Sequence, residues 1–176
     1  MHLYHKVPQE MAGEVLYPLN TLKEIHPEAY EFQVKKYIGR EEVMDNQIPS
    51  MNCLWNDVLH FSPVHPQLIF DQLKFLGLNN LPPKIEYFEV DSDLFDPENT
   101  TIYLFKNKPL FKMREDNFEE YSGENTLKYT NLPDETKEYY KECITNGKPP
   151  LAFHKIPHIL HKGNLDTKNI QRIIVS

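Results

Sequence analysis

The stretch from residue 55 to residue 91 concentrates side chains that can transfer protons. A strand-like run over 57–61 leads to Ser62 and to two histidines, His60 and His65, at a turn before an expected helix. Binding and catalytic groups tend to lie on loops that a rigid scaffold presents. His60 and Ser62 would project to one face of the strand and could line one pocket. Because Pro63 follows Ser62, the serine could equally shape the turn.

A serine nucleophile is one chemistry that this stretch allows. Ser62 has two histidines nearby in sequence and Asp57 upstream, which are the residue types of a Ser–His–acid system. The residues around Ser62 do not form the G-x-S-x-G elbow that exposes such a nucleophile. Hydrolase chemistry therefore stays an open alternative without a signature.

The chain's eight histidines raise the alternative of a metal-dependent enzyme. His154, His158 and His161 cluster late, and the first two are four residues apart. Pro157 argues against a helix that would place that pair on one face. A zinc site needs three or four converging ligands, and the two cysteines are far apart. We expect no bound metal.

Two further positions carry groups that could hold a ligand. Arg40 follows Gly39, which suits the left-handed residue after a helix end. Its planar guanidinium could clamp a phosphate or carboxylate, or it could pair with Glu41. Asn56 lies beside Trp55, the only tryptophan. Its amide could read a base or a nicotinamide amide, or the pair could be a core anchor with a capping neighbour.

The elements that must position these residues follow from proline and glycine spacing. The segments 27–39, 66–77 and 133–147 each begin with proline and end at glycine, as helices do. Each has one apolar stripe, which in the second consists of Leu68, Ile69, Leu73 and Leu76. A short helix is also expected over 20–24. Strands are expected over 2–7, 57–61, 84–90, 101–105, 151–155 and 171–175. This order predicts an α+β fold with a mixed or antiparallel central sheet and about three amphipathic helices.

Length and composition place limits on the function. The 176 residues fit one domain, since domains hold roughly 100 to 200 residues. A net charge of −7 makes non-specific nucleic-acid binding unfavourable. No apolar run approaches the roughly 20 residues of a membrane span, and no signal peptide is recognisable. We expect a cytoplasmic protein without membrane contact.

The segment 106–133 is polar and irregular in sequence. Long loops without regular structure are uncommon in compact domains and often serve as lids or binding loops. The sequence leaves two alternatives for this segment, a lid over a site and a disordered surface loop.

Several segments in order resemble ADP-ribosyltransferase-like proteins. The run Leu3–Tyr4–His5 is similar to their first strand, and the runs 59–77 and 85–91 resemble a strand, helix and strand of the RNA 2′-phosphotransferase branch. The closing segment 153–175 is similar to the end of that branch. The resemblance implies one ADP-ribosyltransferase-like domain over 1–176. The whole sequence also resembles a bacterial family without an assigned function.

The resemblance implies a nucleotide-type ligand, with NAD as the cofactor. It implies that His5 contacts the ribose and the amide of NAD, with Ser62 on the nicotinamide side. Breaking the nicotinamide–ribose bond creates positive charge that the protein must stabilise. The expected catalytic residues are His5, His60, Ser62 and His158, and the expected cofactor-binding residues are Tyr4, Tyr17, Arg40, Asn56 and His65. The acceptor is left open, and a non-catalytic nucleotide- or protein-binding regulatory domain is the main alternative.

Overall fold

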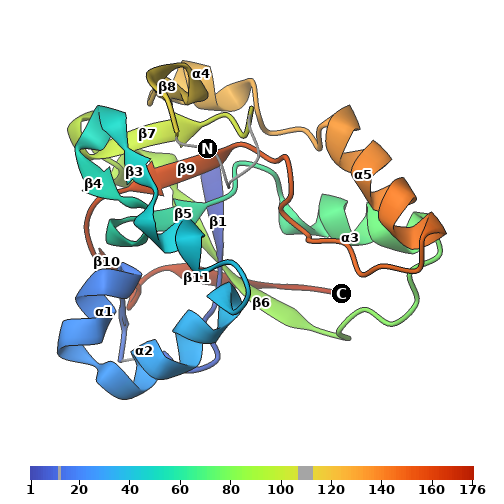
Figure 1. Ribbon diagram of the computed structural model, residues 1–176, viewed down its shortest axis with the longest axis horizontal. Coiled ribbons are helices and arrows are strands. Elements are labelled where there is room, and N and C mark those ends of the chain that lie inside the picture. Colours follow the sequence, from blue (N-terminus) through green and yellow to red (C-terminus); the bar gives the residue numbers. More distant parts are fainter. Residues whose placement is uncertain (12, 107–112) are drawn as a thin grey trace.

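The computed structural model, which describes residues 1–11, 13–106 and 113–176, has an α+β fold (Figure 1). All strand pairings among the described residues are antiparallel, which is one of the two sheet types, mixed or antiparallel, that the sequence predicts. The first sheet has the order β1 (His2–Lys6), β6 (Ile85–Asp91), β11 (Gln171–Val175). The second has the order β5 (Leu59–Phe61), β9 (His158–His161), β7 (Thr100–Tyr103), β8 (Phe118–Glu120). Two-stranded pairs are formed by β2 (Val15–Leu16) with β10 (Leu165–Asp166) and by β3 (Gln47–Ile48) with β4 (Cys53–Leu54).

The sequence predicts that the strands over 2–7 and 57–61 belong to one central sheet. This prediction is wrong, because β1 and β5 lie in different sheets, although the two strands are neighbours. They meet at a single bridge, in which the Tyr4 nitrogen donates to the Ser62 oxygen at 2.9 Å and the Ser62 nitrogen to the Tyr4 oxygen at 2.8 Å. Hydrogen-bonded pairs recur at every second residue of an antiparallel ladder, and the next donor, the Val64 nitrogen, bonds to Ser62 Oγ instead, so the ladder stops there. The two sheets therefore join at the point where the chain turns out of β5.

The main core fills the space between the two sheets. It contains apolar side chains from both: Leu3, Phe61, Phe88, Val90, Ile102 and Ile159 are each 1% exposed or less. Burial of this kind stabilises the fold by roughly 25 cal/mol for each Å² removed from water. The bridge at Tyr4 and Ser62 thus lies against a packed core that fixes the relative position of β1 and β5.

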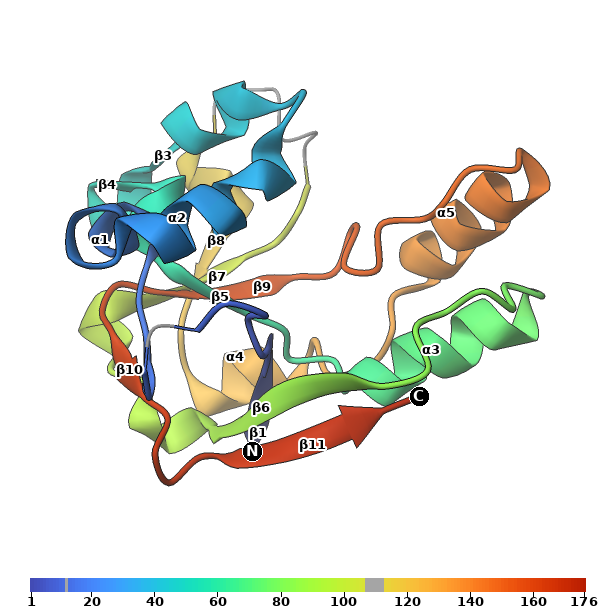
Figure 2. The ribbon, with the colours of Figure 1, turned by 90° about the horizontal axis from the view of Figure 1, so that it is seen from below.

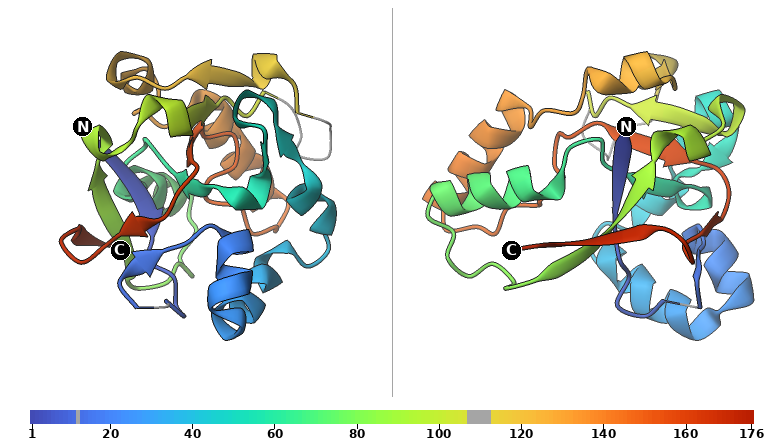
Figure 3. Two further views of the ribbon diagram at one scale, coloured as in Figure 1. Left: turned by 90° about the vertical axis from the view of Figure 1, so that its left-hand side faces the viewer. Right: turned by 180° about the vertical axis from the view of Figure 1, so that it is seen from behind.

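Five helices surround the sheets in the described part of the chain. They are α1 (Leu19–Ile25), α2 (Pro27–Gln33), α3 (Pro66–Phe75), α4 (Gly123–Leu127) and α5 (Asp134–Thr145). Figure 2 shows α1 and α2 with β3 and β4 at one end, and α3 and α5 at the other. The views in Figure 3 keep the blue α1–α2 pair apart from the green and orange helices. No helix among the described residues is long and apolar enough to cross a membrane.

The ends of α3 and α5 lie where the proline and glycine spacing predicts them. The buried residues of α3 agree only in part with the predicted apolar stripe. Gly77 and Gly147, with φ of 90° and 64°, follow α3 and α5. In α3, Ile69 and Leu73 are buried as expected, whereas Leu68 is 45% exposed and Phe70 is buried instead. The apolar face of α3 is therefore rotated from the predicted one toward Phe70.

The first proline-to-glycine segment is not one amphipathic helix. α2 ends at Gln33 and buries no residue, and the chain continues as a 3₁₀ helix, η1 (Val34–Tyr37). The stripe predicted for this segment consists of Tyr30, Val34, Tyr37 and Ile38, of which Tyr37 is buried and Ile38 is 75% exposed. A 3₁₀ helix turns more tightly than an α-helix, so side chains beyond Gln33 leave the predicted face. The short helix expected over 20–24 corresponds to α1.

One strand prediction is corrected. Residues 152–155 form a turn that includes Lys155 at a left-handed φ of 60°, and the strand of this region is β9. Of the segment 106–133, for which the sequence leaves a lid and a surface loop as alternatives, 107–112 lie outside the described residues. The remainder contains η7 (Glu115–Asn117), β8 and α4.

Candidate functional site

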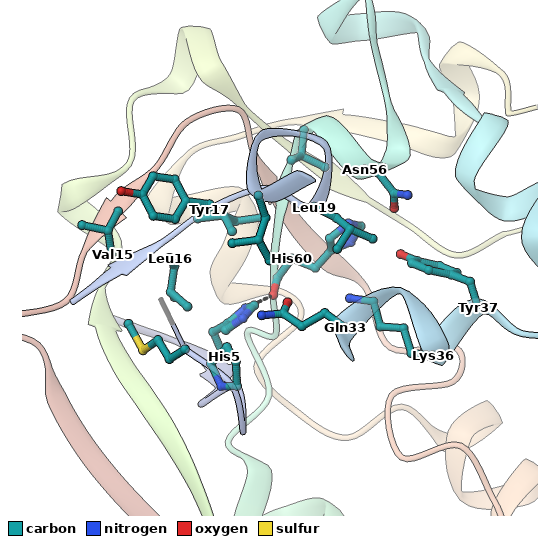
Figure 4. Close-up of a pocket in the computed structure, with 15 residues that line it drawn as sticks. His5, Val15, Leu16, Tyr17, Leu19, Gln33, Lys36, Tyr37, Asn56 and His60 are labelled. Carbon is teal, nitrogen blue, oxygen red and sulfur yellow. Dashed lines mark hydrogen bonds between the residues drawn. The ribbon is translucent and has the colours of Figure 1, made fainter. Parts of the chain in front are cut away.

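A small pocket of about 50 Å³ lies where β1 and β5 approach α1 and η1 (Figure 4). Its polar lining residues are His5, Tyr17, Gln33, Lys36, Tyr37, Asn56 and His60. The remaining lining residues are apolar. Four of the nine predicted site residues, His5, Tyr17, Asn56 and His60, thus come together from separate parts of the chain. No acidic residue lines the pocket in the described part of the chain.

His5 is held at the pocket by the neighbouring strand. Its Nδ1 lies 2.8 Å from the carbonyl oxygen of His60, drawn as a dashed line in Figure 4. Burial lowers the pKa of His5 to about 4; the hydrogen bond to His60 opposes this shift, and the charge of Lys36 adds to it. The His5 imidazole is therefore neutral at pH 7. A neutral imidazole can accept a proton or a hydrogen bond from a ligand.

His60 is held in the same way by a second carbonyl. Its Nε2 lies 3.0 Å from the Trp55 oxygen, and its ring centroid lies 4.4 Å from that of Trp55. Burial is the largest cause that lowers the pKa of His60 well below 6.5, followed by repulsion from His158 and Lys36. The pocket therefore contains two neutral imidazoles, each fixed by a backbone carbonyl.

Three pocket residues were missed by the sequence analysis: Gln33, Lys36 and Tyr37. They come from the end of α2 and from η1, and Figure 4 shows all three beside the two histidines. Lys36 remains exposed to solvent, yet it lies in a hollow crowded by protein atoms. This crowding, followed by the charge of Arg40, lowers the pKa of Lys36. The i, i+3, i+4 spacing of the three residues was a signal that could have placed them on one face.

Asn56 is the most buried polar residue of the pocket. It lies in η4 (Trp55–Asp57), a turn fixed by Asp57, whose carboxylate accepts from the Leu54 nitrogen and from the Asn20 amide, each at 2.7 Å. Asn56 is 3% exposed, and its Oδ1 has no hydrogen-bond partner among the described residues. An unpaired buried acceptor costs about 1–3 kcal/mol, so its presence requires an explanation.

Ser62 is not part of the pocket lining. Its side chain is buried at 4% exposure, and its Oγ donates to the Val64 oxygen at 3.0 Å and accepts from the Val64 nitrogen at 3.1 Å. This is the turn-forming role that the sequence left open. Its hydroxyl is thus already occupied by the backbone of the turn that precedes α3.

Tyr4 and His65 lie together outside the pocket lining. Neighbouring residues of a strand point to opposite faces, so Tyr4 faces away from His5. The Tyr4 hydroxyl donates to Glu89 Oε1 at 3.3 Å, and its ring lies 4.8 Å from that of His65. His65 Nδ1 accepts from the Gln67 nitrogen at 3.1 Å and so caps α3. Both residues hold α3 against the first sheet.

Arg40 and His158 also lie outside the pocket lining. Arg40 contacts Lys36, and His158 lies near His60. The exposed Arg40 donates to the Lys36 carbonyl oxygen through Nε at 3.1 Å and Nη2 at 2.9 Å. His158 Nδ1 lies 2.6 Å from the Ile156 oxygen, and its ring lies 6.4 Å from that of His60. Both residues therefore act on the pocket through the charge or position of a neighbour.

The late histidines do not form a metal centre with each other. The His154 ring packs on Tyr139 at 4.1 Å, away from His60. Within 1–11, 13–106 and 113–176, no three His, Cys, Asp or Glu side chains are grouped so that they could hold a metal ion. The histidines that share a site are His5 and His60, which bind carbonyl groups of the chain.

No protein-family model, no curated protein and no solved structure matches this chain.

Proposed function

We propose that this protein binds NAD or a related nucleotide at the pocket of His5 and His60, as a transferase of the ADP-ribosyltransferase type would. The observation that carries this proposal is the convergence of two neutral, fixed imidazoles with the side chains of Lys36 and Asn56 in one pocket. Ligand sites are typically concave and largely apolar, with a few placed polar groups. This pocket has that character.

The pocket has a charged group at its exposed side and an uncharged polar group at its enclosed side, which favours a nucleotide over a simple anion as the ligand. Lys36 is exposed at the pocket and has the charge that a diphosphate requires, while Asn56 is enclosed. Tyr17 adds an aromatic lining side chain. A ligand with an uncharged ring at one end and phosphates at the other matches this order of enclosed and exposed groups.

Transfer chemistry would rely on the imidazoles. When the bond between a base and a ribose breaks, an acceptor group must lose a proton. His5 or His60, neutral at pH 7, could receive it. The lack of an acidic lining residue among the described residues favours a second candidate, a nucleotide-binding domain without catalytic activity.

Calorimetric titration with NAD and with ADP-ribose tests the proposal. A micromolar site corresponds to about −8 kcal/mol, and losing one hydrogen bond should weaken binding by roughly 1 kcal/mol or more. We expect this loss for His5→Ala. The matched control is His2→Ala, an exposed position of the same strand. The folded protein giving no heat at millimolar NAD would exclude the proposal.

Release of nicotinamide from NAD separates the two candidates. A transferase should release it slowly even without a protein acceptor, and His60→Ala should abolish the release. Binding of NAD without any release over a day would favour the non-catalytic domain.

A further inference from the structure

We infer that the pocket recognises an uncharged group that donates hydrogen bonds, an amide or sugar hydroxyls, and discriminates against phosphate and carboxylate. This inference deepens the proposed function and rests on it, because it names the part of a nucleotide that enters. It follows from an inventory of hydrogen-bond donors and acceptors at the pocket.

The two backbone carbonyls fix the tautomer of each histidine. A carbonyl oxygen only accepts, so His5 carries its hydrogen on Nδ1 and His60 carries its hydrogen on Nε2. In the neutral rings, Nε2 of His5 and Nδ1 of His60 are then acceptors. Neither nitrogen has a partner among the described residues, and neither is among the fully enclosed unpaired atoms. Two acceptors therefore remain open to a ligand.

Asn56 supplies a third acceptor. Its Oδ1 is enclosed and unpaired within the described part of the chain, although it belongs to a residue that lines the pocket. Because Oδ1 is enclosed, a ligand N–H or O–H reaches it only after the atoms that cover it move. A carboxylate or the diphosphate ester of a nucleotide has only acceptor oxygens and would face the lone pairs of the two histidines, which is unfavourable in a poorly hydrated site.

The size of the pocket limits how much of a ligand enters. A water position needs about 10–15 Å³ on the same measure, so 50 Å³ holds the equivalent of about three to five waters. This is enough for a carboxamide or a pair of hydroxyls and too little for a whole nucleotide. Lys36, which has no acidic partner among the described residues, is exposed at the pocket, where the charged part of a ligand would lie.

A pair of nearly isosteric probes tests the inference directly. Nicotinamide donates through its amide, whereas nicotinate has the same ring and a carboxylate. We expect nicotinamide to bind at least tenfold more tightly, and 10 mM sulfate, an anion without an O–H donor at pH 7, not to compete with it. D-Ribose identifies hydroxyls as the preferred donors if it binds more tightly than nicotinamide. Nicotinate binding equally well or better, or neither nicotinamide nor ribose binding at 50 mM, overturns the inference.

Asn56→Leu tests the third acceptor, with Asn131→Leu outside the pocket as the matched control. The leucine has a similar volume and removes an unpaired buried acceptor, so the variant should fold at least as stably as the native protein. Its affinity for the amide or hydroxyl probe should fall at least fivefold. An unchanged affinity in a folded Asn56→Leu protein contradicts the role of Oδ1.

Nitrogen-15 spectra of the imidazoles provide a test that needs no ligand. We expect hydrogen on Nδ1 of His5 and on Nε2 of His60 at pH 7, and a shift of the two bare nitrogens when nicotinamide is added. The opposite tautomer at either ring overturns the inference. NAD binding together with that result would leave the proposed function standing, whereas nicotinamide binding without NAD binding would remove the proposed function alone.

Discussion

The two helical ends of the molecule are built differently. At one end, α3 and α5 bury Ile69, Leu73 and Tyr140 in a continuous apolar cluster. At the other, α2 buries no residue, and the chain changes to the 3₁₀ helix η1, where Tyr37 is the buried side chain. Ala29, Tyr30 and Val34 pack only partly buried against Leu19 and Leu22 of α1. This end contributes Gln33 and Lys36 to the pocket.

The α3–α5 end thus contributes mainly to stability, whereas the α2–η1 end contributes residues to the pocket. Helical stability in proteins comes mainly from packing of an apolar face, to which α2 contributes only partly buried side chains. Segments with few buried apolar contacts open at low free energy, and binding segments are often drawn from them. A pocket of 50 Å³ therefore has one wall, η1, that can adjust to a ligand while β1 and β5 hold the histidines.

The largest expected effect is loss of packing at the α3–α5 end. Leu73→Ala removes a side chain that is 3% exposed, and such substitutions cost about 2–5 kcal/mol. Leu68→Ala, on the exposed side of the same helix, should stay within about 0.5 kcal/mol. Urea unfolding measures both. Equal losses for the two variants would mean that α3 does not pack through the face described here.

The second effect is a pH dependence that belongs to the pocket. Unfolded, His5 binds a proton near pH 6.5, whereas burial holds its folded pKa at about 4. The unfolded state thus binds more protons between these values. His5 therefore contributes stability that is complete above pH 6.5 and is lost as the pH falls toward 4, up to about 3 kcal/mol.

The measurement is the free energy of unfolding between pH 7 and pH 4. His5→Gln should lose less stability than the native protein over this range, whereas His2→Gln on the same strand should behave like the native protein. Parallel pH curves for native protein and His5→Gln would show that His5 is not held neutral by burial. Residual dependence in His5→Gln is expected, because the pKa values of His60 and His158 are also lowered by burial.

The sequence was informative where one local signal decided the structure. Proline and glycine spacing placed α3 and α5, and the strands expected over 2–7, 84–90 and 171–175 correspond to β1, β6 and β11. It was uninformative where tertiary contacts decided. The rotation of α3 toward Phe70 depends on what the helix meets, and the turn at Lys155 moved a predicted strand to β9.

The candidate site shows the same limit. His60 could be predicted because it lies on the strand that leads to the Ser62 turn, and Asn56 because it precedes that strand. His5 was predicted from the resemblance of Leu3–Tyr4–His5 to the first strand of ADP-ribosyltransferase-like proteins. Ser62 and His65 had the same residue chemistry, but their side chains bond to the local backbone. Strand pairing decides which histidine faces a pocket and which one caps a helix. A shift of the strand register by one residue would turn each side chain to the opposite face of the sheet.

The third prediction separates these two kinds of histidine. His65 caps α3 through Nδ1 and lies outside the pocket. His65→Ala should lower the free energy of unfolding by about 1 kcal/mol, the usual cost of losing such a cap. His65→Asn should recover most of it, since asparagine is a favoured capping residue. Affinity for NAD should not change in either variant, and a tenfold loss would place His65 in the ligand site instead.

The smallest expected effect concerns Arg40, which the sequence suggested as a phosphate clamp. Arg40 is exposed and bonds to the Lys36 carbonyl, so Arg40→Gln should change stability by no more than about 0.5 kcal/mol. Its positive charge helps to lower the pKa of Lys36, so the variant should raise that pKa toward the ordinary value, as nitrogen-15 titration of the ammonium group would show. Phosphate-bearing ligands should lose little affinity, because a more fully protonated Lys36 replaces the lost charge at the pocket. A tenfold loss of NAD affinity with an unchanged Lys36 pKa would instead assign Arg40 a direct contact with the ligand and extend the flexible wall of the pocket beyond η1.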